Sequence, residues 1–205
     1  MILVGQYDSP FVRRVAISLL TLGFAYEHDT RSVFGDFDAM RAVNPLGRIP
    51  ALVLDDGETL IDSAAILDWL DETVEPARAL IPREGPARRR ALRLIALASG
   101  AIEKMGAANY ERIIRPSRHR WPEWILRCLT QMEGAVAALA AESWAGPLDQ
   151  AQITTACMIF YARLTDPAML PRGLHPALDA LASRCEALPA FQATRVTDYR
   201  VPHGD

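Results

Sequence analysis

The sequence is poor in cysteine: among its 205 residues only Cys128, Cys157 and Cys185 occur, and they are widely spaced. An odd number of cysteines without a CxxC pair argues against a disulfide framework, and no cysteine has a histidine at the spacing of a metal site. Free cysteine usually behaves as a small hydrophobic residue. We therefore expect reduced, mostly buried thiols, no metal ion and a cytoplasmic protein.

Long apolar runs and strong net charge are absent as well. No run reaches the roughly 18 to 20 apolar residues that a membrane span requires, and residues 1–10 lack the basic region and cleavage site of a secretory signal. The net charge is −3, with Lys104 as the only lysine, so the sequence has no general attraction to nucleic acid. We expect neither a membrane nor a nucleic-acid partner. Hydrophobic residues make up 50% of the chain, enough for one large domain or two small ones.

The first 75 residues alternate between strand-like and helix-like segments. Ser9 and Pro10 offer a capping hydroxyl and a ring that needs no amide hydrogen, which is typical of a helix start, and Gly23 is typical of a helix end. Two apolar runs flank the turn Asp56-Gly57, which indicates an antiparallel hairpin. The pattern predicts the order strand, helix, strand, helix, hairpin, helix, with the single elements at residues 2–5, 10–22, 25–30, 36–42 and 63–74.

The remaining residues carry a different pattern. Three prolines interrupt the alternation in residues 76–86, so we interpret this segment as a linker. No strand is predicted beyond it, and helical segments are predicted at residues 87–114, 122–142, 149–164 and 176–187. The sequence thus predicts an α/β domain at residues 1–75 and an all-helical domain at residues 87–205. Asp149 and Gln152 have the spacing of a capping box, which is a structural feature without chemistry.

The most informative segment is NPLGRIPALVLDDGETLIDSAAILDWLDE, residues 44–72. It combines the series Asn-Pro-Leu-Gly-Arg-Ile-Pro with a hairpin and then Asp-Ser at the start of a helix. This series resembles the glutathione transferase family, and SPFVRRV at residues 9–15 resembles its serine-type, tau- and omega-like members. The resemblance covers the whole chain. It implies a thioredoxin-like domain of order βαβαββα, followed by an all-α helical bundle.

The resemblance also implies a site for glutathione as co-substrate. It implies a cis peptide bond between Ile49 and Pro50, with the backbone of Ile49 pairing with the cysteinyl residue of glutathione like an added strand. Arg48 would pair with the glycyl carboxylate. The resemblance also places Phe11 among the residues that bind glutathione. The alternatives are an ordinary proline at a strand start and an ordinary surface arginine.

Asp62 and Ser63 complete the implied glutathione site. They stand where a helix begins, and a helix start favours a carboxylate. The amide and hydroxyl of Ser63 would hold the γ-glutamyl carboxylate, and Asp62 the neighbouring ammonium. Simple N-capping is the alternative. No Glu or Gln follows either residue at the spacing of a capping box, which favours a Ser63 hydroxyl left free for a ligand.

The resemblance places the thiol of glutathione beside Ser9, whose hydroxyl can donate a hydrogen bond that favours the thiolate. A thiol pKa lowered by about two units would raise the thiolate fraction at pH 7 from roughly 3% to roughly 75%. Because a less basic thiolate is a weaker nucleophile, positioning must supply most of any acceleration. Tyr7 is the alternative donor, since other classes use a tyrosine near this strand end. Its spacing from Pro10 is one residue longer than theirs, which favours Ser9.

An apolar electrophile would lie between the two domains, according to the same resemblance. Tyr7, Phe11 and Phe34 would line its site from the first domain. The first long helix of the second domain would contribute Met105, Asn109, Tyr110 and Ile113. Ordinary helix packing explains the spacing of these four residues equally well.

Three functions follow from these expectations. The first is a transferase that joins the sulfur of glutathione to an electrophile, or that uses glutathione to reduce a peroxide or reactive halide. The second is a catalytically inactive relative that binds protein partners, against which the intact set of site residues argues. The third, a disulfide oxidoreductase, is weakened because position 9 holds no cysteine. Family membership further implies a homodimer.

Overall fold

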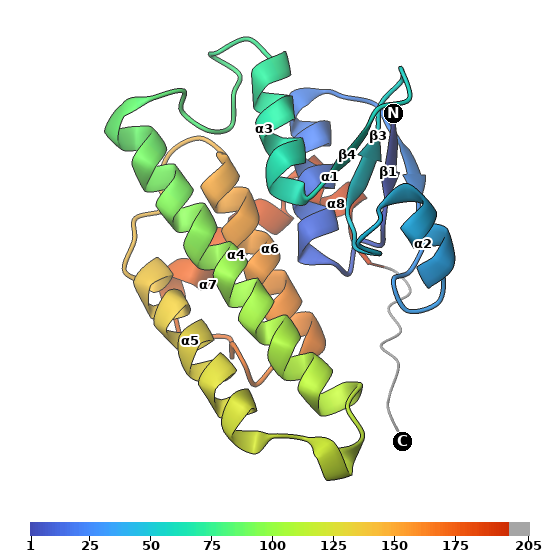
Figure 1. Ribbon diagram of the computed structural model, residues 1–205. Helices are drawn as coiled ribbons and strands as arrows, with labels where there is room; N and C mark the ends of the chain where they lie inside the picture. Colours follow the sequence, from blue (N-terminus) through green and yellow to red (C-terminus); the bar gives the residue numbers. More distant parts are fainter. Residues whose placement is uncertain (197–205) are drawn as a thin grey trace. The chain divides into compact units, whose positions relative to one another are not determined.

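The computed structural model describes residues 1–196, which divide into two compact units (Figure 1). The first unit consists of Met1–Arg88 together with the segment that begins at Ala187, and the second consists of Arg89–Glu186. The elements of the first unit are β1 (Ile2–Val4), α1 (Pro10–Leu22), β2 (Glu27–Asp29), α2 (Phe37–Val43), β3 (Ala51–Val53), β4 (Thr59–Ile61), α3 (Ser63–Thr73) and α8 (Pro189–Ala193). Up to α3 they follow the predicted βαβαββα order, which confirms the predicted fold class.

The four strands form one mixed sheet in the order β2-β1-β3-β4. β1 runs parallel to β2 and antiparallel to β3, and β3 and β4 form the predicted hairpin. In this register Leu3 lies opposite both His28 and Leu52. The parallel pair requires a crossover, and α1 supplies it between β1 and β2.

The two faces of the sheet are covered by different helices. Val4 and Ala51 pack with Met40 of α2 in one apolar cluster. Leu3 and Leu52 alternate with these residues along their strands and point to the opposite face, where α1 and α3 contact both the sheet and each other. The first unit therefore has three layers, and both helices that begin near the predicted glutathione site belong to the same layer.

The last described residues belong to the first unit, not to the predicted helical domain. Arg13 of α1 is fully buried, and its guanidinium donates to the carbonyl of Phe191 at 3.1 Å and to that of Thr194 at 3.2 Å. The same guanidinium lies over the ring of Phe191, 5.6 Å from its centroid. These contacts attach α8 to α1. A helix of five residues is too short to show a period, so the sequence did not indicate it.

The predicted linker at residues 76–86 also packs into the first unit. The carboxylate of Asp71 in α3 accepts from the amide of Leu80 at 2.7 Å and from that of Ile81 at 3.0 Å. Both apolar side chains are buried. The unit therefore extends beyond residue 75 to Arg88, because a side chain of α3 binds the backbone of a proline-rich segment that looks solvent-exposed in the sequence.

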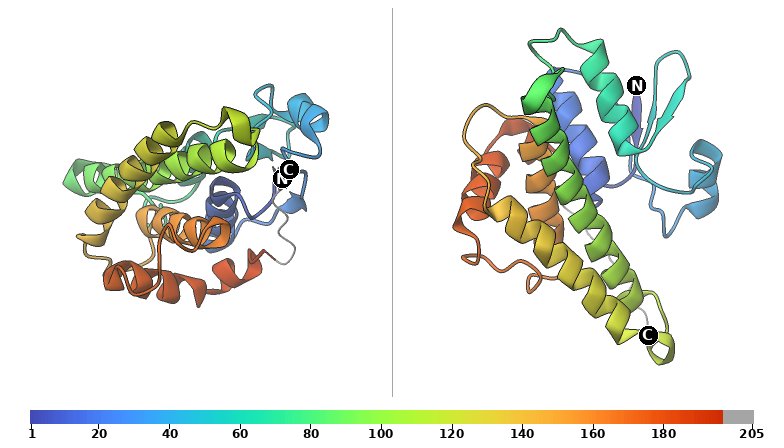
Figure 2. Two further views of the ribbon diagram at one scale, coloured as in Figure 1. Left: turned by 90° about the horizontal axis from the view of Figure 1, so that it is seen from below. Right: turned by 60° about the vertical axis from the view of Figure 1, so that its left-hand side comes forward.

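The second unit is helical throughout its described part, as predicted. It holds α4 (Gly85–Ile113), which starts at the end of the first unit, η1 (Ser117–His119), α5 (Pro122–Ala140), α6 (Gln150–Thr165) and α7 (Pro176–Glu186). Figure 2 shows α4 and α5 lying side by side as an antiparallel pair. Glu142, just after α5, pairs with Arg90 and Arg93 of α4 and so ties the ends of this pair together.

The predicted capping box at the start of α6 is only half formed. Asp149 Oδ1 accepts from the amide of Gln152 at 2.8 Å, as predicted. The side chain of Gln152 does not reach back, and this half of the prediction is wrong. Its Nε2 donates instead to the carbonyl of Trp144 at 3.5 Å, because α6 is buried along most of its length and Trp144 packs beside it.

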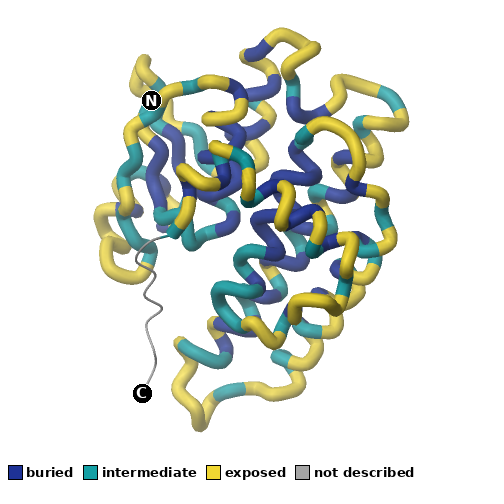
Figure 3. Tube along the Cα trace, turned by 180° about the vertical axis from the view of Figure 1, so that it is seen from behind, coloured by how far each residue is buried: buried dark blue, intermediate teal, exposed yellow. Residues whose placement is uncertain are grey.

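Figure 3 maps burial along the chain, and buried residues are most continuous along α1 in the first unit and along α6 in the second. All three cysteines are buried, as predicted. Burial raises the pKa of the Cys185 thiol to about 11, so this thiol stays protonated at neutral pH. Within residues 1–196, no helix is long and apolar enough to cross a membrane.

Candidate functional site

The site begins where the chain leaves β1 and turns into α1. Gly5 has a φ of +127°, and a Cβ at this position would lie 2.6 Å from Val12 Cγ2 and 2.8 Å from Ile49 Cβ. Only glycine fits both the backbone conformation and the space. The turn thereby packs closely against both Val12 of α1 and Ile49 of the segment that precedes β3.

Ser9 is the N-cap of α1, as predicted. Its Oγ accepts a hydrogen bond from the amide of Val12 at 3.4 Å, and its own amide donates to Asp8 Oδ1 at 2.8 Å. The bond to Oγ is long and uses one lone pair, so the hydroxyl proton stays available for a further acceptor. Ser9 can therefore cap the helix and donate to a ligand at the same time.

Asp8 was not singled out in the sequence. Burial raises the pKa of its carboxyl group, while the hydrogen bond from the amide of Ser9 acts in the opposite direction. Nothing in the pattern of residue types distinguished this aspartate from a solvated loop residue. It holds the backbone of Ser9 in place at the start of α1.

Tyr7 is engaged with other residues of its own unit. Its hydroxyl shares a hydrogen bond of 2.7 Å with the hydroxyl of Tyr26, and its ring stacks on His28 with the centroids 3.9 Å apart. His28 Nε2 in turn bonds to the carbonyl of Gly5 at 2.7 Å. Burial raises the pKa of Tyr7. This cluster, which depends on contacts distant in sequence, holds the Tyr7 side chain within its own unit.

The segment before β3 has a fixed backbone conformation that leaves the backbone groups of Ile49 unpaired in the described part of the chain. The peptide bond between Ile49 and Pro50 is cis, as the resemblance implied. Asn44 braces the loop: its Nδ2 donates to the carbonyl of Arg48 at 2.8 Å, and its Oδ1 accepts from the amide of Leu46 at 3.0 Å. No group within residues 1–196 hydrogen-bonds to the backbone amide or carbonyl of Ile49.

Arg48 and Phe11 differ in their surroundings. The Arg48 side chain is exposed, and no group in the described part of the chain pairs with its guanidinium. Phe11 is half-buried, and its ring lies under the guanidinium of Arg14, 5.3 Å from ring centroid to Cζ. Arg48 is therefore open to a ligand carboxylate, whereas Phe11 contacts a buried cation.

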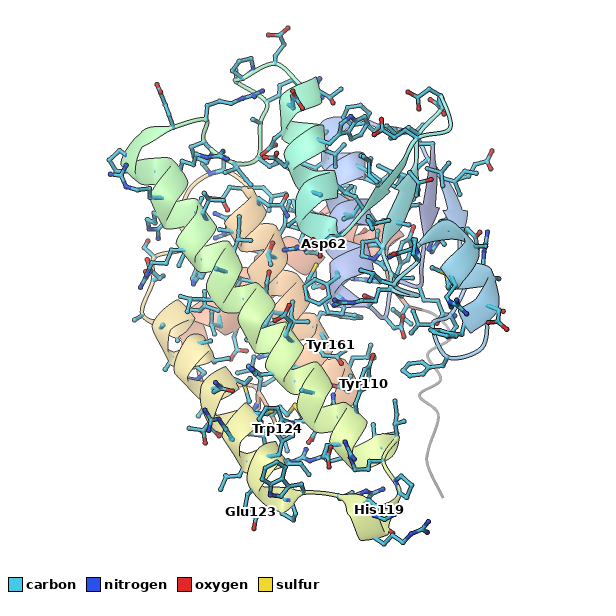
Figure 4. The ribbon with its side chains drawn as sticks, in the orientation of Figure 1. Asp62, Tyr110, His119, Glu123, Trp124 and Tyr161 are labelled. Atoms are coloured by element: carbon cyan, nitrogen blue, oxygen red, sulfur yellow. The ribbon has the colours of Figure 1, made fainter. Side chains whose placement is uncertain are left out.

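Asp62, labelled in Figure 4, and Ser63 mark the start of α3, as predicted. Asp62 is the N-cap, with an unusual φ of 69°, and its Oδ1 accepts from the amide of Ala64 at 2.7 Å. The hydroxyl of Ser63 is not wholly free, contrary to the expectation. Ser63 Oγ accepts from Arg14 Nε at 3.2 Å and from Arg14 Nη2 at 2.6 Å.

These contacts define what the first unit can bind. The start of α3 presents amide hydrogens and a positive helix end, and the guanidinium of Arg14 adds a full positive charge behind Ser63. Asp62 contributes a carboxylate at the exposed edge of the same turn. The arrangement suits a group that carries a carboxylate and an ammonium on one carbon. Gly5 lies close to both Val12 of α1 and Ile49, and Arg14 of α1 binds Ser63, so α1 lies beside each part of the site.

The residues predicted for the electrophile site are divided between the two units. Phe34 in the first unit is 49% exposed. In the second unit Met105 is fully buried, Ile113 is half-buried, Asn109 is 5% exposed and Tyr110 is 53% exposed. Asn109 Nδ2 is buried without a hydrogen-bond partner among residues 1–196. Figure 4 shows Tyr110 of α4 near Tyr161 of the neighbouring α6, a tyrosine that sequence reasoning did not single out.

Comparison with known proteins gives a consistent result. Residues 3–78 match the family model for the N-terminal domain of glutathione S-transferases. The chain is 30% identical over 166 residues to the uncharacterized GST-like protein YibF of Escherichia coli K12, covering 78% of this chain and 81% of that protein. It is 31% identical over 150 residues to the maleylacetoacetate isomerase of Pseudomonas aeruginosa, covering 69% and 70%.

A solved structure extends the similarity to nearly the whole chain. The crystal structure of a glutathione transferase family member from Pseudomonas fluorescens Pf-5, which has glutathione bound, superposes with a TM-score of 0.86. The two sequences are 36% identical, and the match covers 95% of this chain and 98% of the other.

Proposed function

Because the chain belongs to the glutathione S-transferase family, we propose that its first unit binds reduced glutathione and that the protein directs the glutathione thiolate at an electrophilic small molecule. The observation that carries this proposal is the arrangement of Ser9, Ile49 and Ser63 in one unit. α1 contacts Ser9 through Val12 and Ser63 through Arg14, and Gly5 lies close to both Val12 and Ile49. The proposed co-substrate thus has a binding group for each of its parts.

Glutathione would bind along the edge of the first unit as follows. The γ-glutamyl carboxylate would accept hydrogen bonds from the amide and hydroxyl of Ser63. The ammonium group of the same residue would pair with the carboxylate of Asp62. The cysteinyl residue pairs with the unoccupied backbone groups of Ile49. The glycyl carboxylate lies toward the exposed guanidinium of Arg48.

Ser9 is the proposed donor to the sulfur, in keeping with a serine-type site. Its hydroxyl proton, the positive end of α1 and the backbone amides around Ser9 favour the thiolate over the thiol. The spacing of Tyr7 from Pro10, one residue longer than in the classes that use tyrosine, supports Ser9 over Tyr7 in this role. In the first unit the electrophile would lie toward the predicted residues Tyr7 and Phe34. Of the residues predicted in the second unit, the fully buried Met105 cannot contact it.

Isomerisation is the second candidate reaction, and the 31% identity to a maleylacetoacetate isomerase favours it. A thiolate that adds to an activated cis double bond leaves a single bond, about which the carbon chain can rotate. Expulsion of the same thiolate then restores the double bond in the trans form and regenerates glutathione. Conjugation and isomerisation therefore need the same activated sulfur and differ in whether glutathione is consumed.

Calorimetric titration with reduced glutathione and with S-hexylglutathione tests the binding step. We expect micromolar to millimolar affinity, with the hexyl chain tightening it. Substrate turnover with and without loss of free thiol then separates conjugation from isomerisation. The absence of both heat and thermal stabilisation at several millimolar ligand would contradict the proposal and favour a partner-binding protein without catalysis.

We also propose that the protein is a homodimer, with the first unit of one chain packed on the second unit of the other. The family resemblance supports this assembly. Sedimentation velocity at micromolar concentration should give a species of twice the chain mass. A single species of 22.6 kDa would contradict it.

A further inference from the structure

We propose that Arg14 is a positioning residue for glutathione, which fixes the hydroxyl of Ser63 so that its proton points toward the γ-glutamyl carboxylate. The inference rests on the proposed function and concerns how that site recognises the carboxylate. Arg14 does not touch the ligand in this proposal. It acts through Ser63, from the second turn of α1.

The hydrogen-bond geometry at Ser63 carries the argument. A serine hydroxyl has two lone pairs and one proton. Arg14 Nε and Nη2 both donate to Ser63 Oγ, at 3.2 and 2.6 Å, so both lone pairs are used. The proton must then be donated elsewhere, and no group among residues 1–196 accepts it. A ligand oxygen at the start of α3 would provide the missing acceptor.

The Ser63 hydroxyl does not serve as a helix cap. Asp62 already serves as the N-cap of α3, accepting from the amide of Ala64 at 2.7 Å. Ser63 follows it as the first residue of the helix, where its amide hydrogen has no partner within the helix. The amide and the hydroxyl of Ser63 are therefore two donors at one helix end, and a carboxylate can accept from both.

The contact between Arg14 and Ser63 is buried, which restricts the movement of both side chains. Arg14 and Ser63 are each 3% exposed, and the guanidinium is further held over the ring of Phe11. Two hydrogen bonds from one planar guanidinium restrict rotation of the hydroxyl far more than one bond from a flexible ammonium. Lysine at position 14 would keep the charge and lose this restriction.

The neighbouring arginine supplies a matched control. Arg13 is just as buried, but its guanidinium donates to the carbonyls of Phe191 and Thr194 and lies over the Phe191 ring. It supports α8 and has no part in the proposed site. Arg13→Met and Arg14→Met thus remove the same group from adjacent positions of one helix.

The test is a double-mutant cycle on ligand affinity. Dissociation constants are measured by calorimetry for reduced glutathione and for γ-aminobutyryl-cysteinylglycine, which keeps the ammonium and lacks the γ-glutamyl carboxylate. We expect Arg14→Met and Ser63→Ala each to weaken glutathione binding about tenfold to a hundredfold, the range for a hydrogen bond to a charged group. Neither should change affinity for the analogue more than about twofold, and Arg14→Met should add little once Ser63 is alanine.

The outcomes separate the inference from the proposed function. Wild-type protein that binds no glutathione overturns both. Wild-type binding with multiplicative effects of the two substitutions, or with equal losses for both ligands, overturns the inference alone. Arg13→Met, checked by circular dichroism, should leave both dissociation constants unchanged. If Arg14→Met does not fold, Arg14→Lys takes its place in the cycle, with a smaller loss of glutathione affinity expected and the same dependence on Ser63.

Discussion

Two serine hydroxyls stand at the starts of α1 and α3, and their surroundings give them different tasks. Ser9 Oγ accepts a single bond of 3.4 Å from a backbone amide, whereas Ser63 Oγ accepts two bonds from a buried guanidinium. A ligand sulfur beside Ser9 would therefore meet a hydroxyl that can rotate. A ligand carboxylate at Ser63 would meet one whose direction is already set.

Replacing Ser9 by alanine should impair activation of the thiol without abolishing binding. We expect the thiol pKa of bound glutathione to rise and turnover at pH 7 to fall only about threefold, because the smaller thiolate fraction is partly offset by a more nucleophilic sulfur. Loss of the cap should also lower stability by about 1 kcal/mol. Thiolate absorbance of the complex, measured against pH, checks the first effect.

Ser9→Thr is the matched control, since threonine keeps both the cap and the hydroxyl. It should retain most of the turnover. A Ser9→Ala variant with unchanged thiol pKa and unchanged turnover would assign the donor role to another group.

The hydrogen-bonded pair Tyr7 and Tyr26 predicts a loss of stability in alkali. Burial raises the pKa of both hydroxyls, and the bond to Tyr7 raises the pKa of Tyr26 further. A group whose pKa is raised by folding stabilises the protein below its unfolded pKa and loses that contribution above it. Stability should therefore fall as the pH rises above about 10.

Urea denaturation between pH 8 and pH 11 measures this loss. The double variant Tyr7→Phe, Tyr26→Phe removes both hydroxyls together and should show a shallower decline than the wild type. Cys185 remains in both proteins, so its titration cancels in the comparison. Parallel declines would mean that the tyrosine pair does not contribute.

At the scale of elements, the helix signals in the sequence were reliable where they were local. α1 begins and ends at the predicted residues because Ser9, Pro10 and Gly23 mark its ends by backbone chemistry alone. The contact of Arg14 with Ser63 joins positions 49 residues apart and left no local pattern. The same reason explains why α8 and the packing of residues 76–86 were not predicted.

Gly5→Ala should damage the junction between β1, α1 and the segment before β3. The methyl group would collide with Val12 and Ile49, and the positive φ would be strained in addition. We expect a loss of more than about 1 kcal/mol in the free energy of unfolding. Glutathione affinity should fall as well, since the backbone of Ile49 would be displaced.

Gly57→Ala is the control that separates the effect of backbone strain from that of a steric clash. Gly57 also has a positive φ, of +94°, but a Cβ there would meet no atom within 4 Å. It should reduce stability through strain and leave glutathione affinity unchanged. Equal losses of affinity in the two variants would show that the close approach at Gly5 is unimportant for the site.

At the scale of the whole molecule, the first unit is assembled from two separate stretches of chain, Met1–Arg88 and the segment from Ala187 onward. The second unit is inserted between them. The sequence predicted a simple succession of two domains, because composition and helical period do not reveal which unit a short terminal helix joins. Arg13 supplies the physical reason for the actual division.

Arg13→Met should loosen the attachment of α8 to α1. Methionine cannot donate to the carbonyls of Phe191 and Thr194, so we expect the free energy of unfolding to fall by about 2–4 kcal/mol. Limited proteolysis should cut earlier in residues 187–196 than in the wild type. Arg41→Met, which removes a side chain that is 59% exposed, should change neither measurement.

The two-part construction of the first unit also governs the order in which the protein can be completed during synthesis. A nascent chain that has reached residue 186 already contains Arg13, but the Phe191 and Thr194 carbonyls that bind its guanidinium have not yet been made. The helical unit can fold before then, while the unit that carries Ser9, Ile49 and Ser63 still lacks α8, which packs on α1. Synthesis must therefore pass residue 194 before the first-made unit is complete, and a chain that stops earlier is left with an Arg13 guanidinium that lacks the Phe191 and Thr194 carbonyls.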